Sequence, residues 1–231
     1  MVKPARGAAW PLFLISFLVL FLEVALIRWM PAYIRLLAYF SNFILLASFL
    51  GIGVGCLLAP VRANLFKWFP IVQVLLVVAV AAGRLDIAVP QTSESIYFSS
   101  GTTDTVVPVE STWFLPLLCI AVAVLFAVLS QRLGREMNAH PPLRAYIVNL
   151  GGSLAGVVAF GALSALQSPP VAWFGLAFLA AVPFLRELSR AWMVVGAVCL
   201  AVSLGVAHRM SGDTLWSPYY KITAHTQGEE T

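Results

Sequence analysis

The sequence predicts an all-α fold: a polytopic transmembrane helix bundle of about seven spans with a short polar C-terminal tail. Of its 231 residues, 61% are hydrophobic and only 10% are charged, whereas about 25% of the residues of an ordinary soluble domain are charged. The mean hydropathy is +0.92. There are too few polar side chains to cover a soluble fold, but lipid can cover an apolar surface. The composition therefore excludes a disordered chain and argues against a soluble globular protein.

Seven apolar stretches define the expected spans, because a crossing helix needs about 20 mostly apolar residues. The first stretch follows Lys3 and Arg6, but it is too long for a signal peptide and no small-residue cleavage site follows it. The uncharged run 145–185 would be about 60 Å long as one helix, so Ser168-Pro169-Pro170 is expected to break it. The predicted spans lie near residues 10–30, 37–59, 68–83, 113–130, 146–167, 171–185 and 191–207.

These spans divide the chain into a transmembrane bundle over residues 1–208 and a polar tail over 209–231. A polar loop at 84–112 interrupts the bundle, and its segments 95–98 and 105–109 are candidates for a short hairpin. In the tail, Ser217-Pro218 predicts a turn, and residues 219–223 have strand-like content. A lone strand at this position is expected to have nothing to pair with.

The distribution of Lys and Arg predicts that the N-terminus lies in the cytoplasm, because cytoplasmic segments carry the excess of positive charge. With the N-terminus inside, nine basic residues fall in cytoplasmic segments and five in outer ones. The inner set is Lys3, Arg6, Arg62, Lys67, Arg132, Arg135, Arg144, Arg186 and Arg190; the outer set is Arg28, Arg35, Arg84, Arg209 and Lys221. Seven crossings then place the tail outside the cell. The chain is thus expected to be a multi-pass protein of the inner (plasma) membrane.

Five polar side chains within or beside the first, second and fifth spans form the candidate intramembrane site: Glu23, Arg28, Arg35, Asn42 and Asn149. An ionisable side chain within a span usually faces the bundle interior or a cavity, so Glu23 is the leading candidate to meet a cation or a polar group. The alternative is that Glu23 serves helix packing or insertion. Arg28 is about 140° from Glu23 around a helix and is expected to reach the interface. Arg35 either pairs with Glu23 or anchors the interface, and the second interpretation is favoured.

Small residues four apart predict close helix packing in the second and fifth spans. Gly51 and Gly55 form the first pair; Gly152 and Gly156, with Ser153 between them, form the second. A phosphate-binding loop is excluded, since neither pair follows a strand or carries the Lys of a P-loop. Asn149, one turn earlier, is expected to form a hydrogen bond across helices.

No catalytic, cofactor-binding or metal-binding constellation is predicted. Cys56, Cys119 and Cys199 are far apart in apolar runs, which favours buried hydrophobic side chains over a disulfide or metal framework. His140, His208 and His225 lie in connectors or the tail without Cys, Asp or Glu partners at ligand spacing. The basic residues are scattered, so nucleic acid is not an expected partner.

Three segments resemble the N-terminal membrane region of bacterial spermidine-synthase-like membrane proteins, which are multi-span polyamine aminopropyltransferases. The first is LEVALIR at 22–28, followed by Ser48-x-x-Gly51-x-x-x-Gly55. The second is Tyr146-x-x-Asn149-Leu150-x-Gly152-Ser153-Leu154-x-Gly156, in which Asn149 stands where many relatives have Asp. The third is WSPYYKI at 216–222.

The resemblance covers most of the chain and implies that a synthase domain begins in the tail. That domain would start with an edge strand of a small sheet and continue into a Rossmann-like fold. Its glycine-rich acidic loop for decarboxylated S-adenosylmethionine and its catalytic Asp are absent from this chain. Asp213, Glu229 and Glu230 cannot replace them, because no nucleotide-binding strand-loop-helix surrounds them. The predicted outer position of the tail also conflicts with a domain that uses a cytosolic donor.

Three functions therefore stay open. The first is an integral membrane domain that anchors and serves a C-terminal or separate aminopropyltransferase domain. The second is a stand-alone protein that transports or binds a cationic or lipidic solute. The third is a partner subunit, or a homo-oligomer, that packs through the Gly51 and Gly152 faces. In all three the lipid bilayer is the common partner.

Overall fold

The computed structural model describes residues 9–34, 37, 42–82, 111–211, 214–217 and 221–223. These residues form seven α-helices, one 3-10 turn and two short strands. The helices are α1 (Trp10–Trp29), α3 (Asn42–Leu57), α4 (Phe69–Ala82), α5 (Ser111–Asn138), α6 (Pro142–Ala165), α7 (Pro170–Arg186) and α8 (Arg190–Ser211). The 3-10 turn η1 (Leu65–Trp68) precedes α4, and the strands are β1 (Thr214–Trp216) and β2 (Lys221–Thr223).

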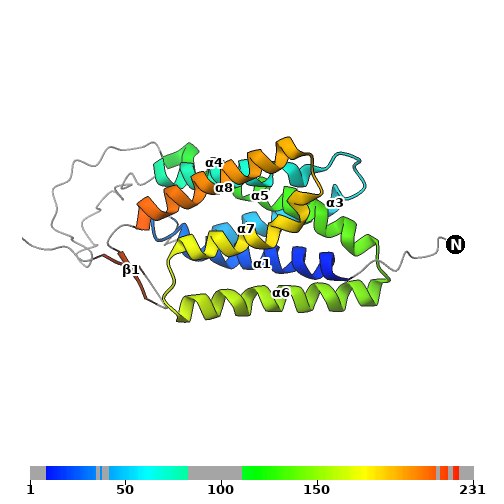
Figure 1. The fold of residues 1–231 in the computed structure, drawn as a ribbon. Helices are drawn as coiled ribbons and strands as arrows, with labels where there is room; N and C mark the ends of the chain where they lie inside the picture. The colour runs from blue at the N-terminus through cyan, green and yellow to red at the C-terminus, as the bar shows by residue number, and fades with distance from the viewer. Residues whose placement is uncertain are drawn as a thin grey trace, which may run out of the picture.

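Helix α1 is the central helix of the bundle. It packs against α6, α7 and α5, while α3 packs on α5 and α4 packs on α8. Figure 1 shows the helices side by side, with α1 and α7 between α6 on one side and α4 and α8 on the other. Leu12, Ile15, Leu18 and Leu22 of α1 are completely buried. A helix that is apolar all round, as α1 is, belongs in such a fully enclosed position.

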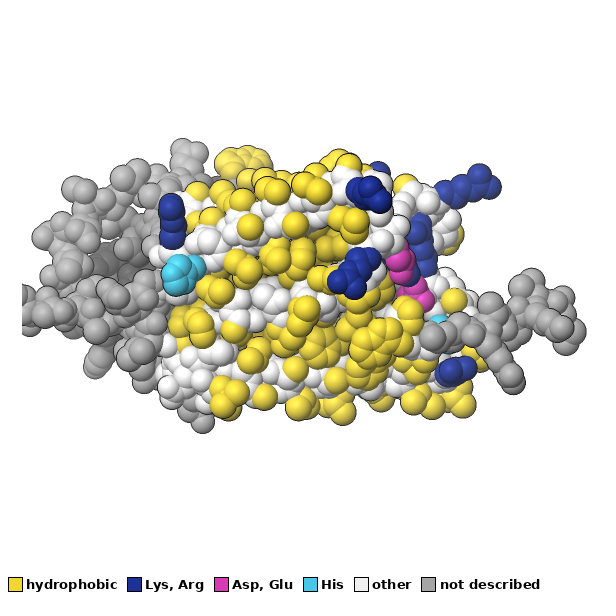
Figure 2. All heavy atoms as spheres, in the orientation of Figure 1, with side chains coloured by type: hydrophobic (Ala, Val, Ile, Leu, Met, Phe, Trp, Pro, Cys, Tyr) yellow, Lys and Arg dark blue, Asp and Glu magenta, His cyan; other side chains and the backbone are white. Residues whose placement is uncertain are grey.

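The outer surface between the two ends of the bundle is apolar. Hydrophobic side chains cover much of the face seen in Figure 2, and large ones such as Leu50, Leu154 and Leu179 are more than half exposed. An apolar surface of this extent is what a lipid-embedded protein presents. Five helices, α1, α4 with its preceding turn, α5, α6 and α8, are long and apolar enough to cross a membrane; α3 and α7 are shorter apolar helices. The predicted all-α membrane bundle is confirmed.

Helix α5 differs most from its predicted span. The apolar run 113–130 predicts a helix that stops before the polar segment 131–144, but α5 continues to Asn138. Its added turns carry Gln131, Arg132 and Arg135, which contact neighbouring segments instead of solvent alone. Tertiary partners therefore extend this helix beyond the limit set by hydrophobicity.

The two ends of the bundle differ in charge. One end joins α3 to α4, α5 to α6 and α7 to α8, and carries the basic residues of those connections; the chain also enters α1 there (Figure 1). Figure 2 shows Lys and Arg side chains gathered at this end, which we call the basic end. The strands lie at the opposite end. In the described part of the chain, the tail therefore leaves the bundle on the side away from the basic end.

The tail strand has a partner, contrary to the expectation from the sequence. β2 pairs antiparallel with β1, with Trp216 opposite Lys221 and Thr214 opposite Thr223. The prediction overlooked residues 214–216, because they were assigned to the polar remainder after the last span. The candidate hairpin at 95–98 and 105–109 lies outside the described residues.

Candidate functional site

Glu23 lies in the interior of the bundle and binds a second helix. Its side chain is 2% exposed. The hydroxyl of Ser48 on α3 donates to its Oε1 at 2.5 Å, while Oε2 is buried without a hydrogen-bond partner. A carboxyl group in an apolar environment is costly unless it is paired. Glu23 is therefore a polar link between α1 and α3 with unused hydrogen-bonding capacity.

Arg28, in the last turn of α1, binds the tail. Its guanidinium carbon lies 5.1 Å from the centroid of the Trp173 ring and 5.8 Å from that of Trp216, and Nη2 donates to the carbonyl oxygen of Ser217. Arginine combines planar stacking on aromatic faces with directed hydrogen bonds. A residue expected at the lipid interface thus holds the segment that follows α8.

Trp216 anchors the tail in an aromatic cluster at the same end. Its side chain is 4% exposed. Its ring meets that of Trp173 at a centroid distance of 5.0 Å and that of Tyr33 at 6.3 Å. Trp173 in turn meets Phe160 of α6 at 5.1 Å. The start of the tail is therefore part of the bundle core and not a free extension.

Asn149 forms the expected contact between helices. The hydroxyl of Ser16 on α1 lies 2.8 Å from its amide oxygen and 2.7 Å from the Leu12 carbonyl oxygen. Asn42, by contrast, begins α3 and is exposed. Arg35 lies outside the described residues, so its proposed pairing with Glu23 is not tested.

The structure does not bring the predicted polar residues together into one site. Glu23 binds α3, Arg28 binds the tail and Asn149 binds α1 at Ser16. Glu23 and Arg28 form no ion pair among the described residues, as their 140° separation predicts. The polar residues act as three separate cross-links between helices.

The glycine pairs lie at the two closest helix contacts. A Cβ placed on Gly51 or Gly55 would come closer than 3.0 Å to backbone oxygens of Ala123 or Ala127 in α5. A Cβ on Gly152 or Gly156 would do the same with Phe13 or Phe17 in α1. Small residues permit this approach of backbones. Ser153, between the second pair, is half-buried.

A polar network at the basic end was not anticipated from the sequence. The Gln131 side chain donates to the carbonyls of Leu58 and Ala63 at 3.1 and 2.9 Å and accepts from the Leu65 amide at 2.8 Å. Arg135 adds bonds to carbonyls of the same connection, including Ala63 at 2.7 Å. The α3–α4 connection is thus held to α5. The one feature of the sequence that points to this network is the position of Gln131 directly after the apolar run 113–130.

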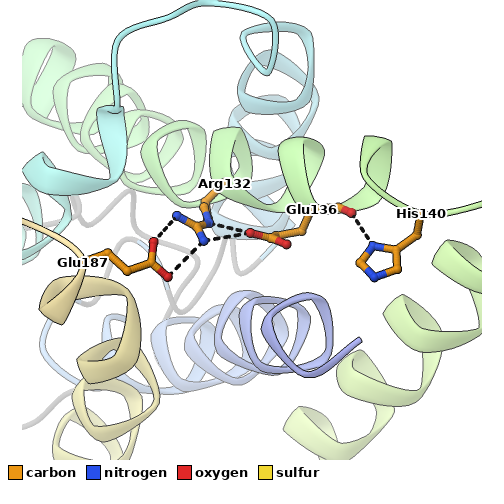
Figure 3. Close-up of polar contacts among 4 residues, drawn as sticks. All are labelled: Arg132, Glu136, His140 and Glu187. Atoms are coloured by element: carbon orange, nitrogen blue, oxygen red, sulfur yellow. Dashed lines mark hydrogen bonds and ion pairs between the residues drawn. The ribbon is translucent and has the colours of Figure 1, made fainter. Parts of the chain in front are cut away.

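Arg132 links α5 to α7 at this end (Figure 3). It binds Glu136 one turn on, at 2.8 Å, and Glu187 just after α7, at 2.6 Å. Its guanidinium also lies over the Phe184 ring at 5.2 Å. His140 continues the row, with Nδ1 2.9 Å from the Glu136 carbonyl oxygen. The network joins α5 to the end of α7.

Within the described ranges, no group of three His, Cys, Asp or Glu side chains lies together, and the three cysteines are free thiols. No family model, no curated protein and no solved structure matches this chain.

Proposed function

We propose that this chain is the membrane domain of a spermidine-synthase-like protein and that it holds the first hairpin of an appended aminopropyltransferase domain against the bundle. The observation that carries the proposal is the burial of Trp216 together with the Arg28 contacts. Both a guanidinium and an aromatic cluster hold the start of the tail, which fits a segment that must be fixed in position relative to the bundle.

Contacts between the segments that carry the family resemblance support this proposal. Glu23 of the first segment binds Ser48, and Arg28 of the same segment binds Ser217 of the third. The bonds span 25 and 189 residues of sequence, respectively. Contacts between segments this far apart in the sequence are the kind that position one part of a protein against another.

The proposal includes an orientation in the inner (plasma) membrane. Cytoplasmic connections carry the excess of Lys and Arg, and the basic end satisfies that rule. The tail then lies on the outer face, so an appended domain on that side requires that decarboxylated S-adenosylmethionine reach it there. The chain itself contributes anchoring and orientation, not catalysis.

The test is the size and activity of the native protein in its own membranes, detected with an antibody to residues 84–112. The expected result is a band well above 25.0 kDa in membranes that transfer aminopropyl groups from decarboxylated S-adenosylmethionine to an amine. A band at 25 kDa would overturn the proposal, as would a larger protein without this activity.

A second candidate function, binding or transport of a cationic solute, is favoured by the unpartnered Oε2 of Glu23. The variant Glu23→Gln keeps the shape and the Ser48 contact but removes the charge. Reduced uptake of spermidine into vesicles containing the variant, at equal protein level, would favour this function. The matched control is Glu136→Gln at the basic end. Equal uptake by Glu23→Gln and the parent protein would exclude a role for Glu23 in transport.

A further inference from the structure

Lys67 lies between two tryptophans where α4 and α8 begin. Its Nζ is 5.7 Å from the centroid of the Trp68 ring and 5.2 Å from that of Trp192. The two rings meet edge to face at 5.3 Å. Trp68 is 44% exposed, so the group lies at the surface of the bundle. Tryptophan is typical of the level of the lipid headgroups.

Among the residues that the structure describes, neither Lys67 nor the neighbouring Arg190 forms an ion pair. Arg190 starts α8 two residues before Trp192 and is exposed. The acidic side chains described at the basic end, Glu136 and Glu187, both bind Arg132. An anionic ligand at this surface would therefore meet two basic side chains that form no ion pair with the described part of the chain.

The surface next to this charge is suited to acyl chains. α4 and α8 pack on each other, and both present exposed apolar residues away from the bundle: Leu75 and Val78 on α4, and Val194 and Val198 on α8. They continue along the same helices from the basic group into the span. An occupant that fits both parts has an anionic headgroup and hydrocarbon tails.

We propose that Lys67, Trp68, Arg190 and Trp192 form a binding site for the headgroup of an anionic phospholipid. The Lys67 ammonium and the Arg190 guanidinium contact the phosphate, the tryptophan rings flank the glycerol region, and the acyl chains follow the α4–α8 surface. Basic pockets between transmembrane helices on the cytoplasmic side bind anionic headgroups in this way. The site is independent of any appended domain.

The test is native mass spectrometry of the full chain in detergent, titrated with phosphatidylglycerol or with phosphatidylcholine of the same acyl chains. Each basic residue near an anionic headgroup contributes about a 5-fold change in affinity, so Lys67→Gln with Arg190→Gln is expected to weaken phosphatidylglycerol binding about 30-fold. Lys67→Arg should retain binding. The matched control is Arg144→Gln, an exposed basic residue at the same end.

Three results would overturn the site. The first is equal affinity for phosphatidylcholine and phosphatidylglycerol. The second is unchanged phosphatidylglycerol binding by the double variant when it retains the parent's helicity and elution volume. The third is retention of inorganic phosphate with the same sensitivity to the double variant, which would indicate a site for a free anion instead of a lipid.

Discussion

At the scale of single residues, the bond between Glu23 and Ser48 is a polar contact in an apolar interior, and its two partners depend on each other. Ser48→Ala removes the one hydrogen-bond donor that the described residues supply to the buried Glu23 carboxyl group. A buried polar group left unsatisfied costs about 1–3 kcal/mol. We therefore expect Ser48→Ala to lower the thermal unfolding temperature of the purified protein.

The double variant Glu23→Leu/Ser48→Ala gives the control for this interpretation. Replacing both partners by apolar side chains removes the unsatisfied group, so the double variant is expected to be more stable than Ser48→Ala alone. A double variant that is no more stable than Ser48→Ala would contradict a direct coupling between the two side chains.

The contact of Arg28 with the tail makes a second prediction at this scale. Arg28→Met removes a charged hydrogen bond and two cation–π contacts, which should raise hydrogen exchange in residues 214–217 and 221–223 at least about ten-fold. Arg28→Lys keeps the charge but not the planar group, so its hydrogen-exchange rate in these residues should lie between those of the parent protein and Arg28→Met. Arg209→Met, an exposed arginine near the same end, is the control. Unchanged exchange in Arg28→Met would show that Trp216 alone holds the tail.

At the scale of helices, the glycine contacts predict a position-specific effect of one methyl group. Gly152→Ala and Gly51→Ala would force backbone oxygens of α1 and α5 to move, with an expected loss of about 1–3 kcal/mol. A Cβ added at Gly161, on α6 with Gly152, or at Gly53, on α3 with Gly51, would meet nothing within 4 Å, so Gly161→Ala and Gly53→Ala are the controls. These controls should be neutral or gain up to about 1 kcal/mol from helix propensity.

Thermal unfolding followed by circular dichroism measures all four glycine variants. The prediction concerns the difference in stability between the two variants of each helix. An equal loss of stability in Gly152→Ala and Gly161→Ala would therefore argue against close packing as the cause. A loss confined to Gly152→Ala and Gly51→Ala would support it.

Helix positions could be predicted from the sequence as far as hydrophobicity determines them. The apolar runs locate every described helix, and Ser168-Pro169-Pro170 does separate α6 from α7. The end of α5 could not be predicted, because its last turns are polar. They are stabilised by carbonyls of the α3–α4 connection, which bind Gln131 and Arg135. Such a partner lies about 70 residues away in sequence and leaves no local pattern.

The candidate site was predictable only in its residue types. An ionisable residue within a span indicates a polar partner, and Glu23 has one, but nothing marks Ser48 as that partner. The spacing of Glu23 and Arg28 did predict that they lie on different faces. Arg28 was expected at the membrane interface, and its contacts with the rings of Trp173 and Trp216 were not predicted. These rings come from α7 and the tail, far from Arg28 in the sequence.

At the scale of the whole molecule, the arrangement of the ends predicts the membrane topology. In a cysteine-free background, a single cysteine at position 209 should react with an impermeant maleimide on intact cells. One at position 62 should react only after permeabilisation, because the basic end is expected in the cytoplasm. Both positions are exposed in the structure. Labelling of both from the same side would contradict an odd number of crossings between them.

The short helices have a consequence for the surrounding bilayer. Helix α3 has 16 residues, so it is about 24 Å long, while the hydrocarbon core of a bilayer is about 30 Å thick. Its outer face, with Leu46, Phe49 and Leu50, is exposed, so in a membrane it would face lipid. Acyl chains beside α3 must shorten to match it, at a cost of a fraction of a kcal/mol for each Å of mismatch. We therefore expect a local preference for thin bilayers beside α3, which would draw short-chain lipids to that side of the bundle and favour neighbours that are short on their facing sides.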